Sequence, residues 1–286
     1  MDNLKAKKRH PEEIAVYSAI YVCAAFSVLL LLGIIVYVFA KGARRVNWAF
    51  LTGVTSILHG TVGIAGNILN TLIIILLTMI ITTPIGVGAA IYLNEYAKLG
   101  KLVTVIIFAT ETLAGIPSII FGLFGMLFFG QLCHMGYSLL TGSLTLTLMV
   151  LPLVTRNTQE ALKTVPDSFR TGAVGLGAGK WYTIRTILLP SAMPGIVTGV
   201  ILAIGRIIGE SAALLFTAGS AHLLPKTFDA FLEKIFHSGG TLTIQLYLSA
   251  SKGEFEVAFG IAVVLLVIVL LINFGTKRLA KKLEKH

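Results

Sequence analysis

The stretch IAVYSAIYVCAAFSVLLLLGIIVYVFA (residues 14–40) contains no charged side chain over 27 consecutive positions. A helix needs about 20 apolar residues to cross the hydrocarbon core of a bilayer, so this run is long enough to do so. It is longer than the apolar core of a secretory signal, and no clear small-residue cleavage site follows it. We therefore expect the run to be retained as a first transmembrane helix.

The overall composition is also that of a membrane protein. Of the 286 residues, 56% are hydrophobic and 13% are charged, whereas a soluble domain has about 25% charged residues. The mean hydropathy is +0.88. These values argue against a soluble enzyme, a disulfide scaffold and a disordered chain, and they predict an all-α integral membrane protein. We interpret Cys23 and Cys133, which lie in apolar runs, as packing residues.

Further runs of low charge follow the first one. Between Glu111 and Arg156 the sequence has no Asp, Glu, Lys or Arg, but this stretch is too long for one helix and is expected to break near 130–136. We therefore predict six transmembrane helices, with both ends of the chain on one side of the membrane. The five runs after the first cover 67–94, 102–130, 138–155, 187–220 and 257–276.

Lysine and arginine are distributed unevenly between the two sides that this arrangement defines. Sixteen of them lie before the first helix, in the 94–101 and 156–186 loops and after residue 276, and six lie in the opposite loops. Because positive residues accumulate on cytoplasmic loops, both termini are predicted to be cytoplasmic. The net charge of +10 then reflects topology and contact with anionic lipid heads, and no nucleic-acid partner is expected.

The 156–186 loop carries the signals of a short helix. Thr164 is a candidate cap, and Pro166 and Asp167 suit the first helical turn. Three glycines that end the helix follow, at positions 175, 177 and 179. A second amphipathic segment is expected from Trp181 into the next transmembrane run.

One face of this predicted helix is apolar. Phe169, Ala173 and Leu176 are spaced four and three residues apart, which places them on the same side. Such a helix can dock a cytoplasmic partner, or it can lie on the membrane surface without a partner. The pattern alone leaves both interpretations open.

The same loop carries a recognisable motif. Its spacing resembles the signature EAA-x3-G-x9-I-x-LP of bacterial ABC importer permeases. The Gly and the I-x-LP end match, whereas Thr171 replaces the leading Glu and Gly172 replaces the first Ala. The resemblance implies that this loop docks a cytoplasmic ATPase, through Phe169 and Leu176 and the residues at the motif positions. Those positions are Thr171, Gly172, Ala173, Gly177, Ile187, Leu189 and Pro190.

Three other segments make the resemblance more specific. They are PIGVGAAIYLNEY (84–96), AGIPSIIFGLFG (114–125) and IGRIIGESAALLFT (204–217). Together with the loop they resemble the PstA-type permeases of phosphate-specific ABC transporters over residues 67–275. The sister PstC-type permeases have related motifs. A permease for a related oxyanion, such as sulfate or molybdate, is the main alternative, and a secondary transporter is a less favoured one.

The resemblance implies a type I ABC importer permease (MetI-like) architecture and an assembly. Residues 67–276 would form the permease domain with the coupling loop 156–186, preceded by a tail, the first helix and an outer loop in 1–66 and followed by a basic tail in 277–286. It also implies a PstC-type second permease subunit, a PstB-type ATPase dimer and a PstS-type phosphate-binding protein, in a bacterial or archaeal cytoplasmic membrane. ATP would be used by the ATPase, and no cofactor is expected on this chain.

Two charges interrupt the predicted fifth helix, at Arg206 and Glu210. A charge at a helix centre costs roughly 2.5–3.5 kcal/mol on insertion scales, so it should face protein or water. Within one continuous helix the two residues are four apart and can touch. They also fall on a face of small residues that lets another helix approach closely. The members of this row are Gly195, Gly199, Ala203, Arg206, Glu210, Ala213 and Thr217.

We favour a role for Arg206 and Glu210 on the substrate path or gate. Arg can contact a phosphate bidentately, and Glu210 would temper its charge. A structural ion pair is the alternative. Glu111, about nine residues into the third helix, is a further candidate, either as a partner of Arg206 or near the cytoplasmic interface.

Catalytic and nucleotide-binding motifs are not found in the sequence. The nearest stretch to a phosphate-binding G-x4-G-K-[ST] loop is GLGAGKW at 175–181, which lacks the spacing and the final Ser or Thr. No H-E-x-x-H or Ser/His/Asp arrangement is present, and no histidines have metal-ligand spacing. The sequence therefore predicts a non-enzymatic subunit without a metal site.

Overall fold

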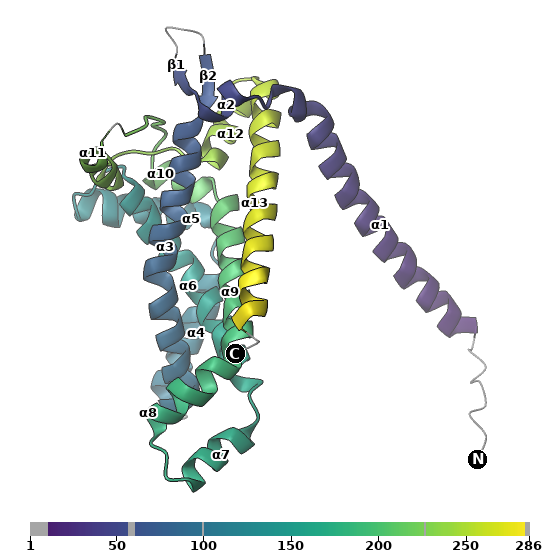
Figure 1. Ribbon diagram of the computed structural model, residues 1–286, viewed down its shortest axis with the longest axis vertical. Coiled ribbons are helices and arrows are strands. Elements are labelled where there is room, and N and C mark those ends of the chain that lie inside the picture. Colours follow the sequence, from purple (N-terminus) through teal and green to yellow (C-terminus); the bar gives the residue numbers. More distant parts are fainter. Residues whose placement is uncertain (1–10, 57–60, 99, 226, 284–286) are drawn as a thin grey trace.

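A computed structural model describes residues 11–56, 61–98, 100–225 and 227–283. Within these ranges the regular secondary structure is helical apart from one hairpin (Figure 1). The long helices are α1 (Pro11–Gly42), α3 (Ala65–Ile91), α6 (Leu139–Lys163), α9 (Leu189–Gly209) and α13 (Phe255–Leu283). The shorter helices are α2 (Trp48–Thr52), α4 (Lys101–Gly115), α5 (Ser118–Gly125), α7 (Asp167–Gly175), α8 (Lys180–Thr183), α10 (Ala212–Thr217), α11 (Phe228–Glu233) and α12 (Leu242–Ser251).

Several one-turn segments extend these helices. π-helical turns follow α3 at η2 (Tyr92–Tyr96) and α5 at η3 (Met126–Leu132), and a third, η4 (Ile184–Leu188), joins α8 to α9. Two 3₁₀ turns are η1 (Ala43–Arg45) and η5 (Lys234–Phe236).

The predicted all-helical membrane fold is confirmed. In the described part of the chain, five helical segments are long and apolar enough to cross a membrane, and a sixth span results if one bent helix pair is counted. This pair, α4 with α5 and η3, bends by 104°. The span expected over 102–130 is therefore not one continuous helix but two helical segments with a sharp bend between them. The break lies at Pro117, because a proline disfavours helical backbone in the preceding residue, and Ile116 is extended with ψ 132°.

The predicted fifth helix over 187–220 also needs correction. Helical structure begins earlier, at Lys180, and continues through η4 and α9 to Gly209. Glu210 is then extended, with ψ 122°, and α10 is a separate helix. Because α6 continues to Lys163, the non-spanning part of the expected 156–186 loop is only 164–179.

The helix predicted in that loop is present as α7, which ends at Gly175. Its expected cap is different. Thr164 lies at the end of α6, where its hydroxyl donates to the carbonyl of Ala161 at 2.8 Å, and Pro166 occupies the position before α7. Thr164 therefore ends one helix and does not begin the next.

The core is built around α6, the most enclosed of the spanning helices. The small residues predicted on α9 face it. A Cβ atom at Gly195 would come within 2.5 Å of the Cβ of Ala161, and one at Gly199 within 2.6 Å of the Cβ of Asn157. Ala203, one turn further, is fully buried. The small-residue face of α9 thus allows close packing against α6, as predicted for this part of the row.

A hairpin and a set of amide contacts organise the end of the molecule opposite α7 (Figure 1). Strands β1 (Val54–Ser56) and β2 (Thr61–Ile64) are antiparallel and lead into α3. At the start of α3, the side-chain amides of Asn67 and Asn70 both donate to the carbonyl of Gly240, at 2.9 and 3.0 Å. These buried bonds fix the N-terminal end of α3 to the segment before α12.

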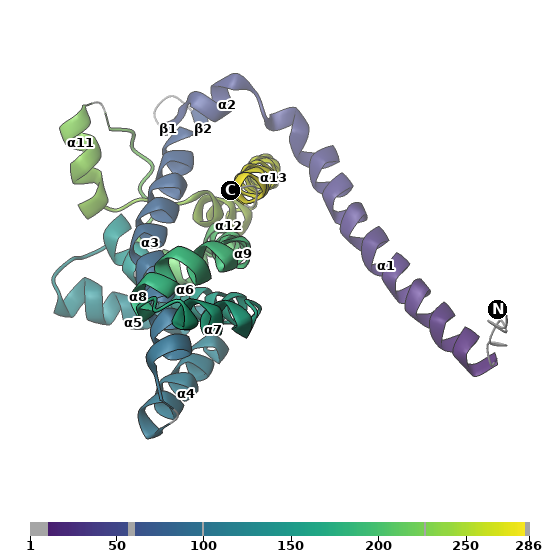
Figure 2. The ribbon, with the colours of Figure 1, turned by 60° about the horizontal axis from the view of Figure 1, so that its bottom comes forward.

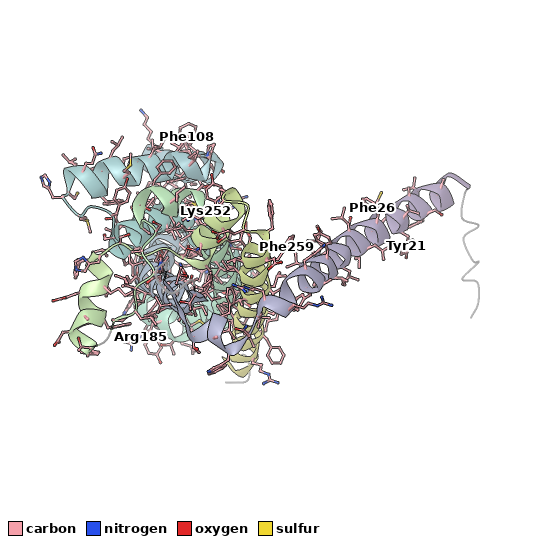
Figure 3. The ribbon with its side chains drawn as sticks, turned by 90° about the horizontal axis from the view of Figure 1, so that it is seen from above. Tyr21, Phe26, Phe108, Arg185, Lys252 and Phe259 are labelled. Carbon is pink, nitrogen blue, oxygen red and sulfur yellow. The ribbon has the colours of Figure 1, made fainter. Side chains whose placement is uncertain are left out.

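Helix α1 lies apart from the bundle. Figure 2 shows it extending away from the remaining helices, which it meets at its C-terminal end. There the ring of Tyr37 packs edge-on against Phe259 of α13 with centroids 5.7 Å apart. Figure 3 shows Tyr21 and Phe26 further along α1, far from the bundle. Most of the apolar surface of α1 is therefore not covered by the described part of the bundle.

Candidate functional site

Two of the predicted path residues line one cavity between α4, α6 and α9. Its volume is about 220 Å³. Glu111 comes from α4 and Arg206 from α9, and Arg156 comes from the α6 wall. The structure thus places Glu111 and Arg206 along one cavity, and within the described residues no ion pair joins them. Other lining residues are Thr110, Ala114, Met149, Pro152 and Leu153.

A second cavity, of about 210 Å³, adjoins the first and shares Thr110, Glu111 and Arg156 with it. It extends along the last turns of α6, toward the end of the molecule where α7 lies. Its additional lining residues are Leu93, Ile107, Gln159, Glu160 and Lys163. We call the two cavities together the charged cavity.

Sequence reasoning missed the α6 wall because it ended this helix at residue 155. Arg156, Gln159, Glu160 and Lys163 are spaced three, one and three residues apart, which places them on one face of a continued helix. This spacing was the signal in the sequence that could have indicated a continued helix with a polar face. A polar helical face that continues an apolar span is easily taken for the start of a loop.

The cavity is lined by three cationic and two acidic side chains. Arg156 pairs with Glu160 at 3.3 Å, but their side chains are 70% and 61% exposed, so the pair contributes little to stability. Among the described residues, neither Arg206 nor Lys163 has a carboxylate within ion-pair distance. The cavity therefore offers cationic side chains to a passing anion.

The predicted contact between Arg206 and Glu210 is not formed. Because α9 ends at Gly209, Glu210 lies outside the helix, and its carboxylate accepts a hydrogen bond from the backbone N–H of Ala213 at 3.1 Å. Glu210 is buried and caps α10, whereas Arg206 is exposed to the cavity. The carbonyl of Glu210 also accepts a bond from Thr243 at 2.9 Å.

The coupling-loop residues divide into a buried and an exposed set. Ala173 is buried against the bundle, whereas Leu176 is 90% exposed and Phe169 is also exposed. The predicted common face is therefore wrong for Ala173. The exposed apolar surface instead consists of Phe169, Val174, Leu176, Trp181 and Tyr182.

The motif positions have distinct local roles. Thr171 and Gly172 are exposed, and the hydroxyl of Thr171 donates to the carbonyl of Asp167 at 3.2 Å. Gly177 has φ +77°, a left-handed conformation that favours glycine at a helix end. The I-x-LP end lies at the join between η4 and α9, with Ile187 in η4 and Leu189 and Pro190 in the first turn of α9.

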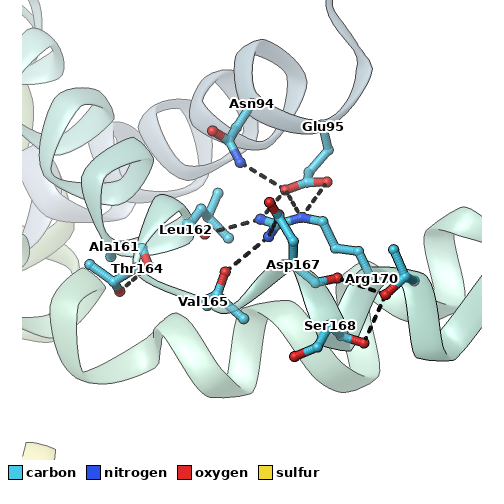
Figure 4. A network of polar contacts seen from close by, with 10 residues as sticks. Asn94, Glu95, Ala161, Leu162, Thr164, Val165, Asp167, Ser168 and Arg170 are labelled. Atoms are coloured by element: carbon cyan, nitrogen blue, oxygen red, sulfur yellow. Dashed lines mark hydrogen bonds and ion pairs between the residues drawn. The ribbon is translucent and has the colours of Figure 1, made fainter.

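A polar network that sequence reasoning missed holds α7 in place (Figure 4). The guanidinium of Arg170 forms an ion pair with Glu95 in η2, with Nη2 and Oε1 2.9 Å apart. It also donates to the carbonyls of Leu162 and Val165, each at 3.0 Å. The hydrogen bond to Glu95 raises the pKa of Arg170 above its usual value. Only the isolated charge of Glu95 at the end of an apolar run indicated such a contact.

The described residues offer no metal site. Within the described ranges, no three His, Cys, Asp or Glu side chains gather closely enough to hold a metal ion. The candidate functional features of the described chain are thus the charged cavity and the α7 region.

Comparison with known families identifies the kind of protein. The family described as "Binding-protein-dependent transport system inner membrane component" matches residues 82–286. The chain belongs to this family. The permease is therefore a multi-pass inner-membrane protein, the non-catalytic transmembrane subunit of a binding-protein-dependent ABC importer.

Individual relatives agree with this assignment. The permease is 35% identical over 273 residues to the probable ABC transporter permease protein YqgI of Bacillus subtilis, covering 92% of this chain and 93% of that protein. It is 34% identical over 244 residues to the phosphate transport system permease protein PstA of Xylella fastidiosa, covering 84% and 82%.

A solved structure supports the fold. The permease superimposes on a chain of a bacterial alginate ABC transporter, crystallised with an alginate-bound periplasmic protein, with a TM-score of 0.71. The match covers 96% of both chains at 14% sequence identity. The predicted type I importer architecture is therefore confirmed at the level of the fold.

Proposed function

We propose that this permease carries inorganic phosphate across the cytoplasmic membrane. The observation that carries the proposal is the charged cavity, in which the cationic side chains of Arg206, Arg156 and Lys163 converge from two helices and outnumber the carboxylates of Glu111 and Glu160. The similarity to PstA proteins supports phosphate among the anions that such a cavity can receive.

The chemistry of the cavity suits a transient anion site. A partly desolvated phosphate loses much of its hydration, and guanidinium groups can replace it with bidentate hydrogen bonds. Glu111 faces the same space as Arg206. Its negative charge lowers the affinity for an anion, so a phosphate that enters the cavity can also leave it.

The permease would work with several partners. We propose a second, PstC-type permease subunit, a PstB-type cytoplasmic ATPase dimer and a PstS-type phosphate-binding protein. The exposed apolar residues on and beside α7, with Leu176 the most exposed, would dock the ATPase. ATP would be bound and hydrolysed there, and the permease itself would hold no cofactor. Both termini would be cytoplasmic, on the side of α7.

The test is radiolabelled phosphate uptake in cells that lack this chain, with and without its restoration. We expect restoration of the chain to restore phosphate uptake. A hundredfold excess of sulfate or molybdate should leave this uptake unchanged. Uptake of sulfate or molybdate in place of phosphate would assign the permease to a related oxyanion. Uptake that needs an ion gradient but no ATP would overturn the importer mechanism.

A further inference from the structure

We propose that Arg170 and Glu95 form the connection through which movement of α7 reaches the membrane-spanning helix α3. This proposal rests on the function above, because it assigns a positioning role to two residues in the same transport cycle. We call the pair, with the carbonyls that bind Arg170, the Arg170 anchor.

The anchor uses the full hydrogen-bonding capacity of the arginine. Nε donates to both carboxylate oxygens of Glu95, at 3.3 and 3.4 Å, and Nη2 donates to Glu95 and to the carbonyl of Leu162. Nη1 donates to the carbonyl of Val165 and to Asp167. Each of the five N–H groups of a guanidinium thus has an acceptor. A lysine has three donors and cannot reproduce this planar set.

The anchor is also shielded from solvent. The side chain of Glu95 is 8% exposed and that of Arg170 is 24% exposed, whereas Asp167, on the same guanidinium, is 92% exposed. Shielded charge-assisted bonds hold their geometry better than exposed ones, because water competes less for the donors. The contact to Glu95 therefore fixes the position of Arg170, and the contact to Asp167 adds little.

Helix α7 has few other means of attachment. Ala173 is the one buried residue of α7. Pro166, which precedes the helix, forms no capping hydrogen bond through its side chain. A nine-residue helix of this kind is too short to be stable alone. Its main other contacts are with α8 and η4, so its position relative to α3 depends on the Arg170 anchor.

Glu95 lies in η2, which continues directly from α3. A π-helical turn of this type is typical of functional positions. At its other end α3 is bonded to Gly240 through Asn67 and Asn70. A displacement of α7 would therefore act on α3, which is bonded to other segments near both of its own ends. The ammonium of Lys180 over the ring of Tyr96, 4.8 Å from its centroid, links α8 to the same turn.

A distance measurement tests the anchor without reference to the transported substrate. Spin labels are placed on Lys98→Cys, after η2, and Ser168→Cys, on the exposed side of α7, in an assembled importer whose Cys23 and Cys133 are replaced by Ser. With Arg170 present, we expect one narrow distance distribution that is the same with and without bound ATP. Arg170→Gln should broaden it.

The matched control is Asp167→Asn, which alters an exposed contact to the same guanidinium and should leave the distribution narrow. A distribution that stays narrow in Arg170→Gln would overturn the proposal. So would a wild-type distribution that shifts when ATP binds, because α7 and η2 would then move separately.

A second readout is the amount of substrate imported per ATP hydrolysed. In Arg170→Gln we expect this ratio to fall about tenfold. A tenfold change corresponds to about 1.4 kcal/mol, which is near the lower limit of the free energy of a charge-assisted hydrogen bond. The double variant with Glu95→Gln should be no worse than either single variant. Additive losses would contradict a shared role. If the wild-type importer carries no phosphate, the proposed function fails, and the distance test still decides on the anchor.

Discussion

The carboxylate of Glu111 and the guanidinium of Arg206 line one cavity from two different helices, α4 and α9. Within the described chain no ion pair joins them, so both charges remain available to groups that enter the cavity. Helix α4 is the first half of the bent pair and α9 packs closely on α6. A change in the angle between α4 and α5 would therefore alter the distance between Glu111 and Arg206.

Arg206→Gln should reduce phosphate uptake by at least about tenfold, because the variant loses a charge-assisted contact to the anion. Gln retains some bulk and hydrogen bonding, so insertion and assembly should be normal. Uptake by cells and recovery of the complex are the two measurements. Lys252→Gln, which removes an exposed charge after α12, is the control and should transport normally. Normal uptake in Arg206→Gln would exclude a path role for Arg206.

Glu210 should tolerate loss of its charge better than loss of its oxygen. Glu210→Gln keeps an acceptor for the N–H of Ala213, whereas Glu210→Ala leaves that buried N–H without this bond. We expect the alanine variant to lose about 1 kcal/mol of unfolding free energy, as for a lost helix cap. Thermal unfolding of the detergent-purified protein measures the difference. Equal stability of both variants would argue against the capping role.

The close approach of α9 and α6 predicts that Gly195→Ala is destabilising. The added methyl group would lie 2.5 Å from the Cβ of Ala161, so the helices must separate. We expect a loss of about 1–3 kcal/mol, the usual cost of overpacking. Thermal unfolding is the assay, and Gly205→Ala, whose Cβ would meet nothing within 4 Å, is the control. Adding Ala161→Gly to the first variant should restore stability, and failure to do so would locate the problem elsewhere.

Gly177→Ala should disturb the loop between α7 and α8. Gly177 has open space around it but a φ of +77°, so the penalty is conformational and about 1–2 kcal/mol. Because this penalty is local, the protein should still insert, while substrate import per ATP falls. The bulkier Gly177→Trp should have a larger effect. Gly175→Ala, also in open space but without a positive φ, should behave as wild type, and a loss equal to that of Gly177→Ala would contradict the explanation.

The proposed orientation can be tested with single cysteines in a background without Cys23 and Cys133. A cysteine at Ser168, on α7, should react with a membrane-impermeant maleimide only in inverted vesicles. A cysteine at Lys252, at the end of α12, should react only in intact cells or right-side-out vesicles. The reverse pattern would invert the topology and remove the ATPase-docking assignment of α7.

Much of the helical arrangement was predictable, because transmembrane runs are determined by local composition. The positions and angles of the helix breaks were less predictable. Pro117 is a visible helix breaker in the sequence, but the size of the bend depends on what packs on each side of it. The break after Gly209 has no proline, and it is stabilised by contacts of Glu210 with Ala213 and Thr243. Periodicity continued the helix through this point and so produced a pair, Arg206 and Glu210, that the structure separates.

The candidate site was predicted in part for the same reason. Arg206 and Glu111 were identified because a charge within an apolar run is visible in the sequence. Their common cavity depends on the packing of α4, α6 and α9, and Arg156 and Lys163 were assigned to a loop. The contact between Glu95 and Arg170 joins segments 75 residues apart. No local pattern indicates which distant charge such a residue meets.

The separate position of α1 has a consequence for how the protein is made. During synthesis α1 enters the membrane before the other described helices, yet its contact through Tyr37 and Phe259 is with α13, which follows all of them in the sequence. Almost the entire chain must therefore be inserted before this contact forms. Until then α1 diffuses in the lipid on a tether, and loop closure over so long a chain is slow compared with the packing of neighbouring helices. Docking of α1 onto α13 is thus expected to be a late event in biogenesis, after the bundle around α6 has formed.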